Sequence, residues 1–388
     1  MAVSPCSYDF FIYLYSAETC RIRRNLEKIQ LIFIHGPKEK FRNDNIRSHE
    51  QNETFFNNVI IPGISVLPSC SSFMWCARDQ FSFEGVAEQN IFPRGYRLET
   101  PTTDYVARGH VASMIRKDIH GFLESPSYAK SLAENLLRRK CPNNKFVTIT
   151  AREIERDNKN NTRNLNQLVW EKAIQTLTSL GVKTFVIRDT SSIGSPPMFE
   201  DVEELSEASI HLPLRLAIYE KALVNFTKNN GPAALLLYSK ARAIYFNDFD
   251  DDVVACSRNW FQSVFGIAQD GQFPFTTQSK SCVWSDESEN RIVNEVKQAL
   301  TSTPNNAMLN SFANEDCLRA SITVAFNYLI EQLQHGLLSE DVDLFTQIKL
   351  LNSEHNLFND LDLELQKLSG VHIQPEIVHN LITKTPIR

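Results

Sequence analysis

The stretch from residue 223 to residue 247 limits the fold of this chain more than any other segment. It contains an apolar run, a four-residue turn of sequence Asn-Asn-Gly-Pro at 229–232, an Ala- and Leu-rich segment at 233–238 and a second apolar run at 242–246. This order is typical of a strand, a tight turn, a short helix and a second strand. The stretch is too short for more than one βαβ unit, and such units build parallel sheets with helices packed on their faces.

The turn at 229–232 has the composition expected where a sheet meets a ligand. Gly231 carries no side chain and would let the backbone approach a bound molecule, and Pro232 suits the first position of a helix. A helix that begins at a strand end points its N–H groups toward the crevice above the sheet, where nucleotide phosphates are commonly bound. We therefore predict that the whole turn contacts a phosphate-bearing ligand, which adds Asn229 and Asn230 to the site. The alternative is an ordinary strand-to-helix turn.

The same alternation of strands and helices extends toward the N-terminus from this unit. Strands are predicted at 146–150, 183–187, 208–211 and 223–227, and helices at 168–180 and 214–222. Polar residues directly follow several strands, and open α/β sheets bind ligands at the carboxyl ends of their parallel strands. The ligand-binding residues predicted from these positions are Arg152, Arg163, Asn164, Arg188 and Asp189. Each arginine could instead form an ion pair that stabilises the domain.

The N-terminal part of the chain is predicted to form a similar α/β domain. Strands are predicted at 8–15, 30–35, 59–62 and 64–69, with one helix at 18–27 and another at 125–139. The Cys-Pro-Asn-Asn sequence at 141–144 breaks the chain, and we place a domain boundary there. The resulting division is 1–142 for the first domain, 143–300 for the second, and 301–388 for a tail of amphipathic helices, which could pack on its own chain or form a homodimer.

Composition and charge exclude several classes of protein. A net charge of −6 argues against the basic surface of a nucleic-acid groove. No apolar run reaches the roughly 20 residues of a membrane span, and the N-terminal run lacks the features of a signal peptide, so a cytoplasmic location is predicted, with peripheral membrane contact left open. The 8 cysteines include no C-x-x-C pair and are interpreted as reduced thiols. The acidic residues at 248–252 are interpreted as a solvated loop, and no metal site is predicted.

Several short motifs occur together along the chain. They lie at 62–70, 92–96, 148–152, 163–164, 186–190, 229–232 and 283–286. As a set, these motifs resemble a little-characterised group of bacterial glycosyltransferase-like proteins, over about residues 8–300. The resemblance implies a GT-B architecture, in which two Rossmann-like domains face each other across a cleft and the C-terminal one binds most of a nucleotide-sugar donor. It also implies transfer of a sugar to a glycan, lipid or protein acceptor, as in polysaccharide biosynthesis.

The chemistry of such a transfer fits the predicted residues. Arginine side chains and a helix N-terminus can stabilise a leaving diphosphate, so neither a bound metal nor a separate cofactor is expected. The acceptor hydroxyl needs a general base, normally a carboxylate or histidine of the N-terminal domain. The candidates are Asp9, His35, Asp44, His49, Asp104 and His110. His35 and Asp44 are taken as the predicted catalytic residues, although the base motifs of better-known GT-B families are not visible.

Two other classes of function stay open. The first is a protein that binds a nucleotide sugar without catalysis and acts as a scaffold or interaction partner through its helical tail. The second is a dinucleotide-dependent oxidoreductase, which requires G-x-G-x-x-G after a strand. The sequence that follows residues 146–150 contains arginine and asparagine in place of these glycines, and it therefore disfavours the oxidoreductase.

Overall fold

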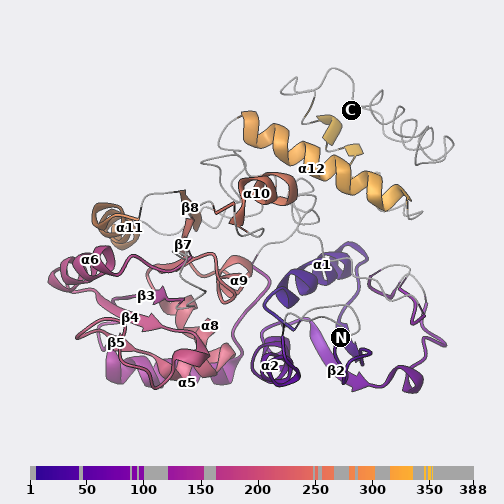
Figure 1. Cartoon of the computed structure of the whole chain (residues 1–388), viewed down its shortest axis with the longest axis horizontal. Helices are drawn as coiled ribbons and strands as arrows, with labels where there is room; N and C mark the ends of the chain where they lie inside the picture. Colours follow the sequence, from indigo (N-terminus) through magenta and orange to yellow (C-terminus); the bar gives the residue numbers. More distant parts are fainter. Residues whose placement is uncertain are drawn as a thin grey trace. The chain divides into compact units, whose positions relative to one another are not determined.

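The structure of the chain is a computed structural model (Figure 1). It describes residues 6–42, 47–87, 90–93, 96–99, 121–152, 163–247, 250–251, 256–265, 279–284, 287–301, 315–334, 345–346, 348–350 and 352. The chain divides into two compact units. The first contains residues 1–105, 120–249 and 277–307, and the second contains residues 106–119, 250–276 and 308–388.

The first unit contains a six-stranded parallel sheet. Its strands are β3 (Phe146–Thr150), β4 (Lys183–Ile187), β5 (Glu203–Glu204), β6 (Asn225–Lys228), β7 (Ala243–Asn247) and β8 (Lys280–Trp284). Their spatial order is β5-β4-β3-β6-β7-β8, and every neighbouring pair is parallel. Because β3 comes first along the chain yet lies between β4 and β6, the strand order reverses beside β3. Doubly wound nucleotide-binding sheets have this order, and it confirms the predicted parallel α/β sheet.

Helices cover both faces of this sheet. They are α5 (Ser127–Lys140), α6 (Gln167–Ser179), α7 (Ser206–Ile210), α8 (Leu212–Lys221), α9 (Ala233–Tyr238) and α11 (Glu289–Thr301). In Figure 1, α6 and α11 lie on one face, and α5 and α8 lie on the other. The core of the α6 face is built around Trp170, whose ring is fully buried and meets the rings of Phe226 and Phe246 edge to face. This packing fixes the start of α6 over the strand ends.

The N-terminal part of the same unit contains a second, two-stranded sheet. β1 (Ile29–Ile34) pairs in parallel with β2 (Cys70–Cys76). The helical elements around them are α1 (Phe10–Arg23), α2 (His49–Phe55), a π-helical segment (Phe56–Ile60), α3 (Ile61–Ile64) and a 3₁₀ turn (Arg78–Gln80). The predicted strand at 30–35 is thus confirmed as β1. The strand predicted at 64–69 is wrong, because residues 65–69 form turns and β2 begins only at Cys70.

Several of the strand predictions are wrong. Residues 10–15 belong to α1, residues 59–64 are helical, and residues 208–210 belong to α7. Within α1, Phe10, Phe11, Leu14 and Tyr15 are all buried, and their spacing is that of one helix face. A short, continuous apolar run indicates burial on more than one side, and a buried helix produces the same run as a buried strand.

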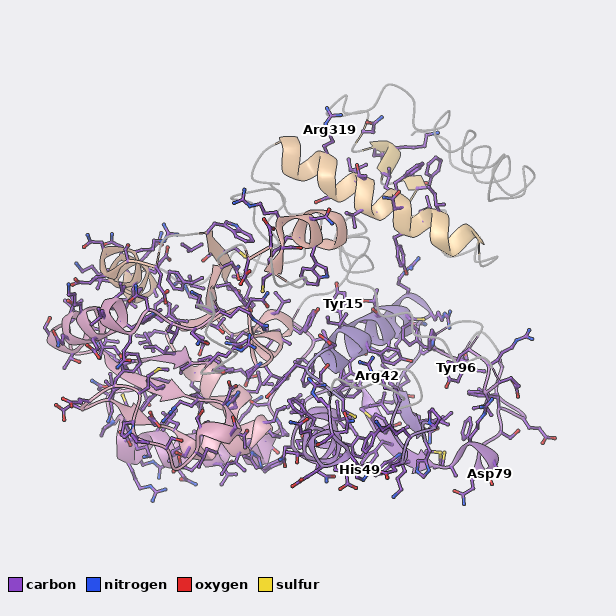
Figure 2. The ribbon with its side chains drawn as sticks, in the orientation of Figure 1. Tyr15, Arg42, His49, Asp79, Tyr96 and Arg319 are labelled. Carbon is purple, nitrogen blue, oxygen red and sulfur yellow. The ribbon has the colours of Figure 1, made fainter. Side chains whose placement is uncertain are left out.

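Helix α1 packs against α9 within the first unit. Tyr15 of α1, which is labelled in Figure 2, has its ring stacked on that of Tyr238 at the end of α9, with 5.3 Å between the ring centroids. Phe122 contacts both rings, with centroids 5.6 Å from each. Three segments that are far apart in the sequence therefore share one aromatic cluster.

The second unit contains α10 (Arg258–Phe265) and α12 (Glu315–Gln334), which contact each other. Phe326, Leu329 and Ile330 of α12 are buried, so this part of the C-terminal tail is helical with an apolar face, as predicted. Within the described ranges, no helix has both the length and the hydropathy needed to cross a membrane. The domain limits at 142 and 300 stay predictions.

Candidate functional site

The carboxyl ends of β3 and β6 meet at the point where the strand order reverses. Thr150, the last residue of β3, lies beside Thr227 of β6. Arg152 follows β3 by two residues and is buried, and Lys228 ends β6 and is also buried. Ligands of open α/β sheets bind in the crevice outside such a reversal. Of the predicted residues, the structure thus brings Arg152 and the turn at 229–232 to one place.

Asn230 joins the two strands at this point. Its Nδ2 donates to Thr227 Oγ1 at 3.0 Å and to the carbonyl oxygen of Thr150 at 3.5 Å. Its Oδ1 accepts the backbone N–H of Ala233 at 3.0 Å, and the N–H of Ala234 donates to the Gly231 carbonyl at 3.1 Å. The N–H groups that follow Gly231 therefore donate within the turn itself, and α9 has only 6 residues. In the structure the N–H groups of Ala233 and Ala234 are engaged within the turn, and contact of the turn with a phosphate stays a prediction.

Gly231 is packed against an aromatic ring of the N-terminal segment. A Cβ atom at this position would lie 2.4 Å from Cδ2 of Tyr8, so a side chain at residue 231 requires that ring to move. Burial raises the pKa of Tyr8 to about 12, with Arg215 opposing the increase and Tyr219 and Asp189 adding to it. The space above Gly231 that the sequence assigned to a ligand is therefore filled by Tyr8.

The other side of the strand ends, at the start of α6, carries a cluster of charged and polar groups. Arg163 Nε donates to the carbonyl oxygen of Asn229 at 2.6 Å. Lys228 Nζ lies 3.3 Å from Oε2 of Glu287, which precedes α11. The Glu287 carboxylate also accepts the backbone N–H of Asn166 at 3.3 Å and the indole N–H of Trp170.

Arg188 and Asp189 lie at the end of β4, on the β5 side of the sheet. Arg188 Nη1 donates to the Pro196 carbonyl at 2.8 Å and lies 3.3 Å from the carboxylate of Glu204. The carbonyl oxygen of Arg188 accepts from Nη2 of Arg215 at 2.8 Å. These contacts favour the ion-pair interpretation of Arg188 that the sequence left open.

The candidate general bases occupy different surroundings. Asp9 directly follows Tyr8, is exposed, and accepts the Ser7 hydroxyl at 2.9 Å. His35 follows β1 and meets the Trp75 ring edge to face at 5.4 Å; burial and the nearby Lys40 ammonium lower its pKa. His49 on α2, which is labelled in Figure 2, lies 3.0 Å from the carboxylate of Glu39 and 3.3 Å from that of Glu53.

Asp44, Asp104 and His110 lie outside the described residues. Among the described candidates, Asp9 is the one whose neighbour in sequence, Tyr8, touches the turn at 229–232. In the part of the chain that the structure describes, no group of three or more His, Cys, Asp or Glu side chains is arranged to hold a metal ion.

Sequence reasoning missed Tyr8, Lys228 and Glu287. Lys228 had a usable signal, because a lysine that ends a buried strand must find a partner or a ligand at the sheet edge. Tyr8 and Glu287 had no such signal, since each reaches the site from a segment far away in the sequence.

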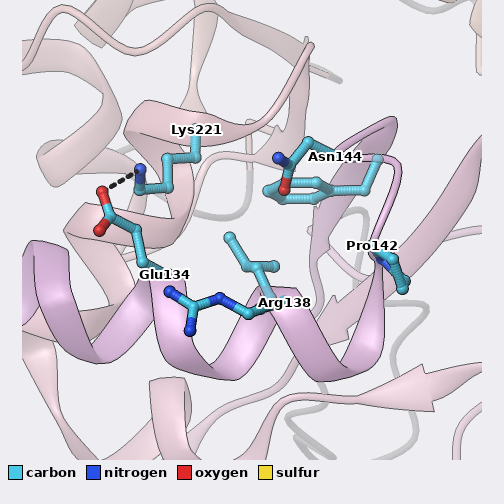
Figure 3. Close-up of a pocket in the computed structure, with 7 residues that line it drawn as sticks. Glu134, Arg138, Pro142, Asn144 and Lys221 are labelled. Atoms are coloured by element: carbon cyan, nitrogen blue, oxygen red, sulfur yellow. Dashed lines mark hydrogen bonds and ion pairs between the residues drawn. The ribbon is translucent and has the colours of Figure 1, made fainter.

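A cavity of about 430 Å³ lies at the opposite, amino end of β3 (Figure 3). It is lined by Glu134, Leu137, Arg138, Pro142, Asn144, Phe146 and Lys221. Glu134 and Lys221 form an ion pair at 3.0 Å, and both side chains are partly exposed. No predicted ligand-binding residue lines this cavity, so it is separate from the site at the carboxyl edge.

The six-stranded sheet defines a doubly wound α/β fold, and comparisons with known proteins add two likenesses. The sequence matches no family model and no curated protein. A glycosyl transferase family 9 protein from Veillonella parvula gives a TM-score of 0.45 at 8% identity, over 76% of this chain and 94% of that chain. The ADP-heptose LPS heptosyltransferase II of E. coli gives a TM-score of 0.42 at 8% identity, over 77% of this chain and 97% of that chain. The first neighbour is named as a glycosyl transferase and the second as a heptosyltransferase, and at these values they are likenesses only.

Proposed function

We propose that the protein is a glycosyltransferase that moves a sugar from a nucleotide-sugar donor to a hydroxyl of a glycan, lipid or protein acceptor without a metal ion. One observation carries the proposal: basic and amide side chains gather at the reversal of strand order in a parallel sheet. Nucleotides are bound at such reversals in doubly wound folds. The proposal retains the GT-B architecture, a cytoplasmic location in a bacterium, and either a monomer or a homodimer.

In this proposal the donor diphosphate lies on the α6 side of the strand ends. Tyr8 fills the space above Gly231, which leaves Arg152, Arg163, Asn164 and Lys228 as the residues for the leaving phosphates. Guanidinium and ammonium groups in a site of low dielectric stabilise the charge that develops on a departing diphosphate. Asn229 and Asn230 then shape the edge of the site, and Gly231 and Pro232 hold the turn in place.

For the general base, the contact between Tyr8 and Gly231 adds Asp9 to the predicted His35 and Asp44, because Asp9 directly follows Tyr8 and is exposed. An exposed carboxylate can accept the proton of an acceptor hydroxyl as the sugar carbon is attacked. His35 is held against Trp75, at the end of the smaller sheet.

The first test is a thermal-shift series with nucleoside diphosphates and nucleotide sugars. A ligand that binds only the folded state raises the melting temperature by mass action. We expect one nucleoside class to raise it in a saturable way, and an assay for sugar transfer or donor hydrolysis with that donor then follows. Absence of any nucleotide effect contradicts the proposal, whereas binding without turnover supports the scaffold alternative.

Replacing Arg152 by alanine is expected to weaken binding of the nucleoside diphosphate found in that series by roughly 1.5–3 kcal/mol, the range for a hydrogen bond to a charged group. Isothermal titration calorimetry measures the change. Arg138→Ala is the matched control, because Arg138 lines the separate cavity at the amino end of β3 and its loss should leave affinity unchanged. Equal affinities of the Arg152→Ala variant and the parent would remove Arg152 from the site.

A further inference from the structure

The ion pair between Lys228 and Glu287 is buried at the sheet edge. Only 4% of the Lys228 side chain and 12% of the Glu287 side chain are exposed. Burying two charges costs free energy of desolvation. A buried ion pair therefore often stabilises a fold no better than apolar residues of similar volume would. Because this pair lies at the carboxyl edge of a doubly wound sheet, where ligands bind, we look for its role in ligand binding rather than in stability.

Glu287 occupies a position suited to an anion. Its carboxylate receives donors from three sources, namely the backbone N–H at Asn166, the indole N–H of Trp170 and the ammonium of Lys228. The first of these lies at the start of α6, a helix of 13 residues whose positive dipole end favours negative charge. One of these donors, Lys228, is also a residue of the proposed phosphate site.

The contact between the two charges is also long. The distance of 3.3 Å between Lys228 Nζ and Glu287 Oε2 exceeds the roughly 2.7–2.9 Å of a strong charge-assisted hydrogen bond. Glu287 has other donors, and it stands in a loop two residues before α11. Lys228 can therefore change its anionic partner without unfolding the sheet edge.

We propose that Glu287 is an internal competitor for anionic ligands, which pairs with Lys228 in the free chain and yields Lys228 to the diphosphate group of a bound ligand. The inference deepens the proposed function and rests on it for the place of the diphosphate. A phosphate offers several acceptor oxygens to an ammonium group, while Glu287 keeps its bonds to Asn166 and Trp170. An anion must therefore displace the Glu287 carboxylate from Lys228 in order to bind, and this competition lowers the affinity of the site for anions.

The test uses inorganic pyrophosphate as the probe and calorimetry as the measurement. We expect Glu287→Gln to bind pyrophosphate at least about tenfold more tightly than the parent, because a negative charge near the anion is removed while the amide oxygen still accepts from Trp170. Glu289→Gln is the matched control. It makes the same change in net charge two residues away, at a carboxylate bonded to Thr176 rather than to Lys228, and should leave the affinity within about twofold of the parent.

A second variant keeps the inference testable if Glu287→Gln folds poorly by circular dichroism. Lys228→Met, made in the parent, should bind pyrophosphate at least about tenfold more weakly than the parent, since the ligand gains no ammonium partner while the nearby arginines remain. The inference is overturned if pyrophosphate binds the parent and Glu287→Gln equally, if Glu289→Gln shows the same gain, or if Lys228→Met binds as the parent does. Failure of the proposed function looks different, because then no nucleotide raises the melting temperature of the parent.

Discussion

Replacing Lys280 by methionine is expected to remove about 3 kcal/mol of pH dependence from the stability of the first unit between pH 7 and 9.5. Lys280 begins β8, is 2% exposed, and donates to the carbonyl oxygens of Ser239, at 2.9 Å, and of Ala241. Burial lowers the pKa of Lys280 to about 7 from an ordinary value of 10.5.

The direction of the effect follows from proton counts. Between pH 7 and 10.5 the unfolded chain holds a proton on Lys280 that the folded chain has lost, so the free energy of unfolding rises with pH in this window. The cost of burying the charged form is present in full below pH 7 and disappears as the pH passes 10.5. A neutral amine still has two protons to donate to the same two carbonyl groups.

Urea unfolding at several pH values measures this effect. The difference in free energy of unfolding between the parent and Lys280→Met should increase with a slope of up to about 1.4 kcal/mol per pH unit. Lys240→Met is the control, since Lys240 is exposed in the neighbouring turn, and its replacement should leave the slope of the parent unchanged. A parallel pair of curves for the parent and Lys280→Met would show that the buried lysine keeps its proton.

Replacing Gly231 by valine is expected to destabilise the first unit by up to about 3 kcal/mol, through overpacking against Tyr8. The sequence analysis assigned the space at Gly231 to a bound molecule, so a side chain there would be expected to weaken ligand binding. The structure alters this expectation because even one carbon atom at residue 231 would lie 2.4 Å from the Tyr8 ring. That ring is held in turn beside Phe11, with centroids 6.1 Å apart.

A double-mutant cycle separates this clash from other causes. Tyr8→Ala removes the ring, so the cost of Gly231→Val measured in that background should fall by at least about 1 kcal/mol. The readout is the free energy of unfolding of the four proteins, followed by circular dichroism. If the valine costs the same with and without Tyr8, the glycine is required for the backbone of the turn and the contact with Tyr8 plays no part.

Much of the six-stranded sheet could be predicted from the sequence. The strands at 146–150 and 183–187 have the predicted limits in the structure, and β6 and β7 differ from the prediction by a few residues. In this region apolar runs are short, polar turns separate them, and helices with clear periodicity lie between them. In this region the secondary structure favoured by the local sequence is the same as the one favoured by tertiary packing.

The N-terminal part was predicted less well because its local signals conflict. The run at 10–15 has strand-forming aromatic residues, yet it is helical, because one helix face buries Phe11 and Leu14 completely. Tertiary packing overrides β-propensity in such a case. The candidate site shows the same division. Arg152 and the 229–232 turn could be located from predicted strand ends, whereas Tyr8 and Glu287 reach the site only through tertiary contacts.

The packing of α1 on α9 has a consequence for how the protein is made. Tyr15 and Tyr238 stack on each other although 238 − 15 = 223 positions separate them in the chain. Translation proceeds at about 5–20 residues per second, so roughly 10–45 s pass between synthesis of the first ring and synthesis of its partner. During that interval Phe11, Leu14 and Tyr15 emerge from the ribosome without their final neighbour on α9. The nascent chain therefore offers an early, aromatic target for chaperones, and its N-terminal helix is docked late.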